Sequence, residues 1–207
     1  MKSTRTSEKL SAALPLSAAL VACLGGCGDE AGPALSDGGV QDLSATLKPP
    51  SGVPALLQPP AGATVTVLFH GRGDQVYVCT AMMAGGTDGG ATTYGWVLKA
   101  PDAKLYDDAG GLAGTHYAGP TWAANDQSTV VGMRVQQVNA PQSDAITWLL
   151  LKAISHTGSG LLAPITFIQR LYTQGGVAPA GGCDVGNLGA ELRQPYSADY
   201  YFYAGGG

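Results

Sequence analysis

The chain has few charged side chains: Asp, Glu, Lys and Arg make up only 13% of its 207 residues. The exposed faces of helices need many Glu, Lys and Arg, so this scarcity argues against a helical bundle and excludes a coiled coil. It also excludes an acidic or basic disordered tail. The net charge of −4 argues against nucleic acid as a partner, because phosphate contacts require clustered Lys and Arg.

The sequence also lacks the patterns of cofactor and metal sites. No Gly-x-Gly-x-x-Gly motif opens a helix after a strand, and we therefore expect no cofactor. The three histidines, His70, His116 and His156, lie in separate segments. No two of them have the spacing of metal ligands, so we expect no metal site. No exact repeat recurs at a fixed period, which argues against a propeller or a solenoid.

The N-terminus has the pattern of an export signal. Lys2, Arg5 and Lys9 precede an uncharged, mostly apolar stretch that runs to Gly26. A basic start followed by a short apolar stretch and small residues is typical of a signal peptide, here residues 1–26. The stretch is too short, and too broken by Pro15, for a membrane span.

Two cysteines at the end of this stretch lie in segments that resemble the bacterial lipobox, in which a cysteine becomes the lipidated first residue. The segments are Leu20-Val21-Ala22-Cys23 and Leu24-Gly25-Gly26-Cys27. Cleavage before Cys27 would leave an even number of other cysteines in the exported protein, which favours Cys27, whereas the residue pattern slightly favours Cys23. Either choice predicts an exported protein that a lipid anchors to a membrane, in the cell envelope or on the outer surface.

The exported part divides by composition into a tether and one domain. Residues 27–52 are rich in Gly, Asp, Ser, Ala and Pro and lack aromatic residues, so we expect a flexible tether. Residues 53–204 form the expected domain, and residues 205–207 a glycine tail. Within the domain, Cys79 and Cys183 are the only cysteines, so an oxidising compartment predicts a disulfide between them.

Short β-branched and aromatic segments recur about every ten residues between turn-forming residues. This pattern predicts an all-β, mainly antiparallel fold, either a β-sandwich or a β-barrel of about 8–10 strands with few or no helices. We expect turns at residues 71–74, Gly-Arg-Gly-Asp, and at Pro101-Asp102. Residues 145–155 fit either a helix or a buried strand.

An ordered set of segments in the expected domain resembles the family called domain of unknown function 3455. The segments are Gln75–Cys79, Trp96, Pro101–Ala103, His116–Trp122, Asp126–Ser128, Ile146–Leu151, Ile168–Gly176 and Tyr196–Tyr203. The resemblance covers about residues 53–204 and implies an exported protein of bacterial or fungal type. It implies no activity, because the family has no assigned mechanism.

The densest polar and aromatic cluster spans residues 116–128. His116, Tyr117, Trp122 and Asp126 are the candidate ligand-binding residues, with the two aromatic rings stacking on a sugar or another flat ligand. His116 and Asp126 are also weak candidates for a general base and the residue that orients it. A structural interpretation is favoured over both: Trp122 lies in the core, His116 bonds to a backbone carbonyl, and Asp126 starts a turn.

Three arginines are candidates for ion pairs that could set the strand register or line a cleft. These are Arg134, Arg170 and Arg193, with Asp126, Asp144 or Asp199 as possible partners.

We therefore expect a lipid-anchored envelope protein that is not an enzyme and that binds a small molecule, a carbohydrate or a surface polymer. Two alternatives stay open: an extracellular hydrolase that uses His116 and Asp126, and a purely structural envelope protein. A hydrolase would need these two side chains within hydrogen-bonding reach in a concave pocket.

Overall fold

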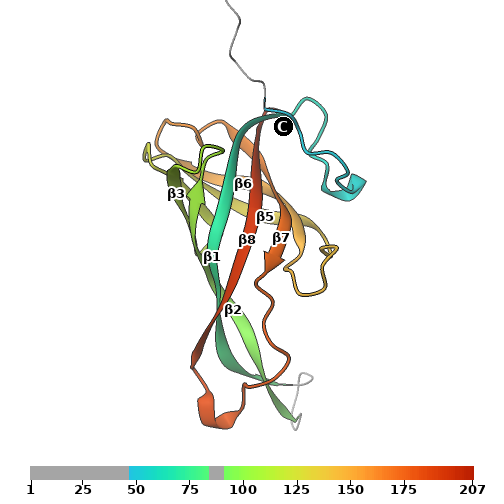
Figure 1. Ribbon diagram of the computed structural model, residues 1–207, viewed down its shortest axis with the longest axis vertical. Coiled ribbons are helices and arrows are strands. Elements are labelled where there is room, and N and C mark those ends of the chain that lie inside the picture. The colour runs from blue at the N-terminus through green and yellow to red at the C-terminus, as the bar shows by residue number, and fades with distance from the viewer. Residues whose placement is uncertain (1–46, 84–90) are drawn as a thin grey trace, which may run out of the picture. The chain divides into compact units, whose positions relative to one another are not determined.

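Eight antiparallel strands form a closed barrel in which each strand pairs with the next along the chain and β8 pairs with β1 (Figure 1). The computed structural model describes residues 47–83 and 91–207. The strands are β1 (Thr64–Met83), β2 (Thr92–Tyr106), β3 (Leu112–Tyr117), β4 (Thr121–Ala124), β5 (Thr129–Val138), β6 (Trp148–Thr157), β7 (Ile165–Gly175) and β8 (Glu191–Ala204). Two 3-10 turns complete the described elements, η1 (Ala55–Leu57) and η2 (Val185–Asn187). The predicted all-β antiparallel class is confirmed, and of the two architectures the chain adopts the barrel.

The predicted signal peptide, with Cys23 and Cys27, lies outside the described residues, as does the tether up to residue 46. None of the described helices is long and apolar enough to cross a membrane.

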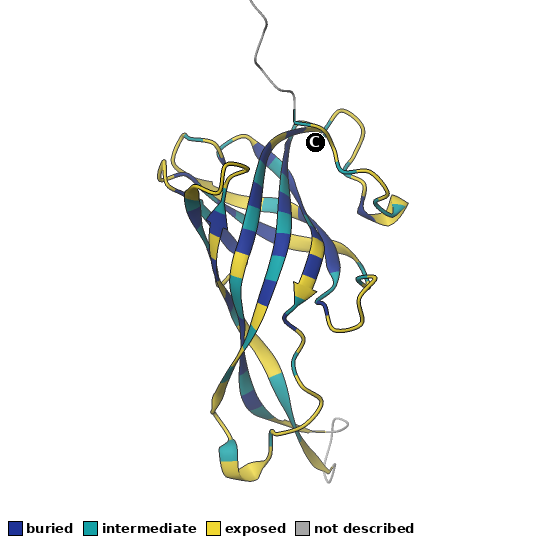
Figure 2. Ribbon diagram, viewed as in Figure 1, coloured by how far each residue is buried: buried dark blue, intermediate teal, exposed yellow. Residues whose placement is uncertain are grey.

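Side chains alternate along the strands between the barrel interior and its outer surface, which Figure 2 shows as alternating bands of burial. On β8, Tyr196, Ala198, Tyr200 and Phe202 point inward and belong to one buried cluster. Trp122 of β4 is the largest fully buried side chain of that cluster. This interior cluster fills part of the barrel and stabilises it by removing large apolar surfaces from water.

A second cluster lies on the outer face of β6, β7 and β8, where the segment before β1 covers it. Leu57 is fully buried there against Trp148, Phe167 and Tyr203. The Gln169 amide donates to the Leu57 carbonyl oxygen at 2.6 Å, which supplies the polar contact that this buried amide needs. The segment therefore packs on the barrel just before the first strand begins.

Both predicted turns are wrong, because residues 71–74 lie in the middle of β1 and Pro101-Asp102 lies in β2. Gly71 pairs with Leu105 of β2 and Ala198 of β8, and glycine suits this inward position because a Cβ there would lie 2.5 Å from the Tyr200 ring. Pro101 is tolerated because β3 pairs with β2 only from Ala103 onward, so β2 is an edge strand at the proline. The ambiguous segment 145–155 becomes strand from Trp148.

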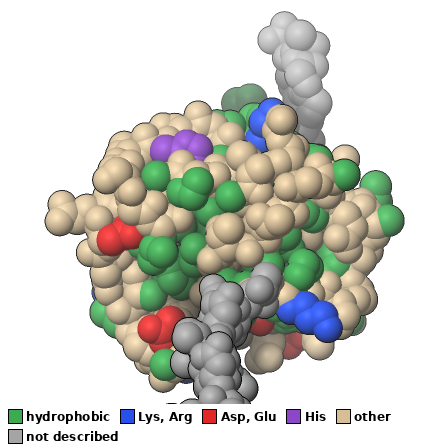
Figure 3. Space-filling model, turned by 90° about the horizontal axis from the view of Figure 1, so that it is seen from above, with side chains coloured by type: hydrophobic (Ala, Val, Ile, Leu, Met, Phe, Trp, Pro, Cys, Tyr) green, Lys and Arg blue, Asp and Glu red, His purple; other side chains and the backbone are tan. Residues whose placement is uncertain are grey.

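The hairpin of β1 and β2 extends well past the barrel, and the loop between β7 and β8 follows it (Figure 1). Cys79 and Cys183 form the predicted disulfide, with their Cα atoms 5.4 Å apart. The Trp96 indole N–H also donates to the Gly181 carbonyl oxygen at 2.9 Å. These contacts attach the loop to the hairpin. The end view in Figure 3 shows mostly uncharged side chains, as the composition predicts.

Candidate functional site

The barrel contains a cavity of about 780 Å³ beside the interior cluster. Its walls come from β1 to β7 and from the segment 145–147, which is held in place where Ala145 pairs with Gly176. The cavity meets solvent near the turn between β3 and β4, because both strands end there, at Tyr117 and Thr121, and neither continues the wall between β2 and β5. Its volume lies in the range of small-molecule sites, roughly 300–1,000 Å³.

Large apolar side chains surround the place where the cavity meets solvent. Four cavity-lining residues are both large and at least two-fifths exposed: Leu98 (49%), Met133 (52%), Ile154 (57%) and Val177 (42%). We call these four residues the apolar rim. Deeper in the cavity, Leu149 and Leu151 are buried members of the interior cluster. A ligand in this cavity would therefore contact mainly hydrocarbon.

Arg170 of β7 is the least exposed of the basic side chains that line the cavity. Its Nε and Nη2 donate to the Thr147 carbonyl oxygen at 3.1 Å and 2.8 Å. Among the described residues no carboxylate forms an ion pair with it. Desolvation by burial lowers the pKa of Arg170 from its usual value, although a guanidinium stays charged at neutral pH.

Two further donors that line the cavity have no hydrogen-bond partner among the described residues. They are the Gln75 side-chain amide nitrogen, in a residue only 1% exposed, and the Trp122 indole nitrogen. Buried polar groups of folded proteins nearly always have partners, so each unsatisfied donor requires an explanation. Gln75 lies on β1 and Trp122 on β4, and both side chains point toward the barrel interior.

His116 of β3 is buried and stacks on Trp122, with ring centroids 4.3 Å apart. Its Nδ1 lies 2.8 Å from the Thr121 carbonyl oxygen. Since a carbonyl oxygen can only accept, Nδ1 carries the proton, and Nε2 of the neutral ring is an acceptor. The pKa of His116 is lowered to about 3, mainly by desolvation on burial; the Thr121 hydrogen bond opposes this shift and the nearby charge of Arg170 adds to it. The imidazole is therefore neutral at physiological pH.

The charged residues that line the cavity are Lys99, Arg134 and Arg170, all of them basic, and no described Asp or Glu lines it. Lys99 is paired with Glu191 outside the cavity, and Arg134 donates to the Gln137 amide oxygen. The whole chain carries a net charge of −4, so this basic lining opposes the overall charge.

Comparison with known families decides what kind of protein contains this barrel. The family model described as Protein of unknown function (DUF3455) matches residues 60–204. The chain belongs to this family. No curated protein and no solved structure matches the chain.

In this DUF3455 domain, the four predicted ligand-binding residues do not come together as one site. His116 and Trp122 lie side by side at the cavity, but Tyr117 points outward and is 44% exposed. Asp126 accepts hydrogen bonds from Ser128 and from the Leu161 backbone N–H, which hold the pKa of its carboxyl below the usual range. No hydrogen bond joins Asp126 to His116. The structure therefore does not assemble the acid–base pair of the hydrolase alternative.

Of the three arginines, Arg193 forms ion pairs among the described residues, as expected, but its partners differ from the carboxylates that were named. Arg193 pairs with Asp74 and Asp102 on the outer surface, where it links β8, β1 and β2. Arg134 and Arg170 bond to uncharged oxygens instead. The described residues contain no group of three His, Cys, Asp or Glu side chains that could hold a metal ion.

Sequence reasoning missed Gln75 and did not place Arg170 in a cavity. A signal was present in the strand alternation. Arg170 stands two positions after Ile168, which belongs to the interior cluster, and Gln75 shares its face of β1 with Phe69. Arg170 and Gln75 at inward positions therefore indicate polar groups inside the DUF3455 barrel.

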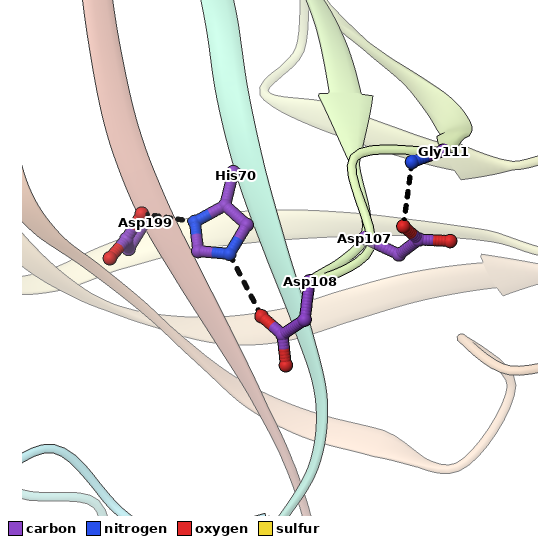
Figure 4. A network of polar contacts seen from close by, with 5 residues as sticks. All are labelled: His70, Asp107, Asp108, Gly111 and Asp199. Carbon is purple, nitrogen blue, oxygen red and sulfur yellow. Dashed lines mark hydrogen bonds and ion pairs between the residues drawn. The ribbon is translucent and has the colours of Figure 1, made fainter.

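A separate polar cluster lies on the outer wall (Figure 4). His70 of β1 places Nδ1 2.7 Å from Asp199 of β8 and Nε2 2.9 Å from Asp108 in the turn after β2. Burial alone would lower the pKa of His70, but the two carboxylates outweigh it and raise the pKa above 6.5. None of the three residues lines the cavity, so we interpret the cluster as a tie between strands.

Proposed function

We propose that this DUF3455 domain is a non-enzymatic binding protein that takes up a small molecule in its barrel cavity. The observation that carries the proposal is the cavity of about 780 Å³ with an apolar lining and a few polar groups, the usual composition of a small-molecule site.

We further propose that the protein is exported and anchored by lipid at Cys27, or alternatively Cys23. The N-terminal pattern of residues 1–26 is the basis of this proposal. The Cys79–Cys183 disulfide supports export, because such bonds persist in oxidising compartments. In this arrangement the domain would bind its ligand outside the cytoplasm while it stays at a membrane surface.

A carbohydrate ligand finds less support than an apolar molecule. Sugars stack on free aromatic faces, whereas one face of the Trp122 ring is covered by His116 and its surroundings include Tyr200 and Phe202. Tyr117 has an exposed ring but lies away from the cavity.

The experiment is a titration of the full chain with N-phenyl-1-naphthylamine, an uncharged probe whose fluorescence rises in apolar surroundings. We expect a saturable signal at one probe per chain. Leu149→Trp, which adds bulk at a buried cavity position, should weaken binding at least about tenfold. Lys104→Trp places the same ring at an exposed position of β2 whose paired residues, Arg72 and Thr115, do not line the cavity, and should leave binding unchanged.

Two results would overturn the proposal. One is the lack of any saturable signal in the wild-type chain. The other is unchanged affinity in Leu149→Trp when circular dichroism and the melting temperature show that the variant is folded.

A further inference from the structure

The geometry points to a specific ligand class, an amphipathic carboxylate whose head binds the Arg170 guanidinium and whose apolar body extends toward the apolar rim. This inference rests on the proposed function, since it names the chemistry of the molecule that the cavity takes up. It follows from the unpaired donors of Arg170, from the charges around the cavity, from the polar groups in its lining and from the apolar rim.

The free edge of the Arg170 guanidinium is the first argument. Arginine has five N–H donors in a planar fork. The edge formed by Nε and Nη2 is engaged by the Thr147 carbonyl oxygen. Among the described residues Nη1 makes no hydrogen bond, and beyond the Thr147 carbonyl Nη2 makes only a long contact of 3.5 Å to the Thr147 hydroxyl oxygen, so the end of the fork formed by Nη1 and Nη2 keeps donors for a ligand. This end can bind a carboxylate through two parallel hydrogen bonds.

The charge balance of the cavity is the second argument. A cation that is withdrawn from water is costly unless an anion accompanies it. Arg170 has no carboxylate partner among the described residues, and Arg134 adds a second positive charge at the cavity. A bound carboxylate would supply the counter-ion that the protein itself does not provide. A cationic ligand would instead meet repulsion from both arginines.

The kinds of polar groups in the lining are the third argument. Gln75 Nε2 and the Trp122 indole N–H are donors without partners among the described residues; both nitrogens are covered by neighbouring atoms, so acceptor oxygens of a ligand would reach them only if side chains at the cavity shift. The neutral His116 ring has Nε2 as its acceptor, which leaves a place for one hydroxyl or amide group of a ligand. An anionic head therefore satisfies more of this lining than an alcohol or an amine would.

The apolar rim is the fourth argument, because it describes the other end of the ligand. Leu98, Met133, Ile154 and Val177 expose large apolar surfaces where the cavity meets solvent. Exposed apolar side chains that gather at one opening mark a binding site rather than an ordinary surface. A hydrocarbon chain or aryl group that reaches from the interior to this rim would cover them.

The test compares dodecanoic acid with dodecan-1-ol, which have the same chain and differ in the head. Binding to the full chain at pH 8 is measured by calorimetry and by displacement of N-phenyl-1-naphthylamine. We expect the acid to bind at least about tenfold more tightly than the alcohol, as a charge-assisted pair of hydrogen bonds requires. In Arg170→Met the acid should lose this advantage while the alcohol binds as before.

Arg193→Met is the matched control, because Arg193 is paired on the outer surface and does not line the cavity. It should keep the full preference for the acid. Equal binding of acid and alcohol by the wild-type chain would overturn the carboxylate inference and leave the proposed function standing. If folded Arg170→Met still prefers the acid over the alcohol, the carboxylate inference is likewise overturned and the proposed function stands. Failure of all three molecules to bind would overturn the proposed function itself.

The wild-type comparison does not depend on any variant, so it decides the inference even if Arg170→Met does not fold. A pH titration of acid binding adds a second readout. Affinity for the acid should fall as its carboxylate becomes protonated below about pH 5, while affinity for the alcohol should not change in parallel.

Discussion

The imidazole of His116 stacks on the indole of Trp122, with the two ring planes only 11° apart. Residues 116 and 122 face each other because β3 and β4 pair directly at these positions. Tyr200 of β8 approaches both rings from across the barrel interior, with centroids 5.1 Å from His116 and 5.4 Å from Trp122. His116 and Trp122 also line the cavity, so these two rings lie between it and the packed interior that contains Tyr200.

The buried state of His116 should make the protein sensitive to acid. The unfolded chain takes up a proton at His116 near pH 6.5, whereas burial holds the pKa of the folded imidazole at about 3. Between these values the unfolded state binds more protons, so the free energy of unfolding falls as the pH is lowered. Thermal melts from pH 7 to pH 4 should show a shallower decline in His116→Phe, which keeps a ring and has no titratable group. Equal slopes in both proteins would contradict the prediction.

Trp122 should be essential for stability, whereas Tyr117 on the same hairpin should not. Trp122 is 1% exposed within the interior cluster, so Trp122→Ala should lower the free energy of unfolding by about 3–5 kcal/mol. Tyr117 is 44% exposed, and Tyr117→Ala should cost no more than about 0.5 kcal/mol. Urea unfolding curves measure both values. If both variants lose a similar free energy of unfolding, the hairpin does not have the inner and outer faces described.

The Cys79–Cys183 disulfide should contribute strongly to stability, because it closes a loop with a sequence separation of 104 residues. In the chain-entropy model such a loop stabilises the folded state by about 4–5 kcal/mol. The double variant Cys79→Ser with Cys183→Ser should therefore unfold at a lower urea concentration than the oxidised wild type. Reduced wild type serves as the control and should match the double variant. If reduction leaves the midpoint unchanged, the bond does not constrain the unfolded chain as expected.

His70 should stabilise the barrel most at acidic to neutral pH. Its pKa is raised in the folded state by Asp199 and Asp108, which outweigh the effect of burial. The stabilisation is therefore fully present below pH 6.5 and is lost as the pH rises through the folded pKa. The difference in melting temperature between wild type and His70→Gln should be largest near pH 6 and should shrink towards pH 9. Asp108→Asn removes only the more exposed of the two contacts and should show a smaller version of the same trend.

The strand pattern predicted much of the fold because alternation is a local property of the chain. Residues 165–172, for example, contain three β-branched and two aromatic side chains, the types that favour strands, and they form most of β7. The two predicted turns failed because Gly71 and Pro101 suit turns when they are considered alone. In the barrel, β1 pairs with a strand on each side at residue 71, and these hydrogen bonds outweigh the local preference of Gly-Arg-Gly-Asp for a turn.

The candidate site was predicted only in part. The sequence drew attention to His116 and Trp122 because they lie in one short segment with other polar and aromatic residues. Arg170 is 54 positions after His116 and Gln75 is 41 positions before it, so no local window contains the three. Asp126 and Tyr117 were included because they are close in sequence, but the alternation of β3 points Tyr117 outward and the turn after β4 directs Asp126 to Ser128 and Leu161.

The sequence by itself determined the all-β class, the family and the pairing of Cys79 with Cys183, since these depend on composition, residue order and the number of cysteines in the domain. The tertiary structure decided that the sheet closes into a barrel, and the closure of β8 on β1 brings the inward residues of distant strands to one cavity. The tertiary structure likewise decides whether a carboxylate lies close enough to pair with Arg170. In this barrel the neighbours of Arg170 are a carbonyl oxygen, aromatic rings and hydrocarbon instead. Strand alternation assigns each side chain a face, but only the closed barrel determines which other side chains share the space behind that face.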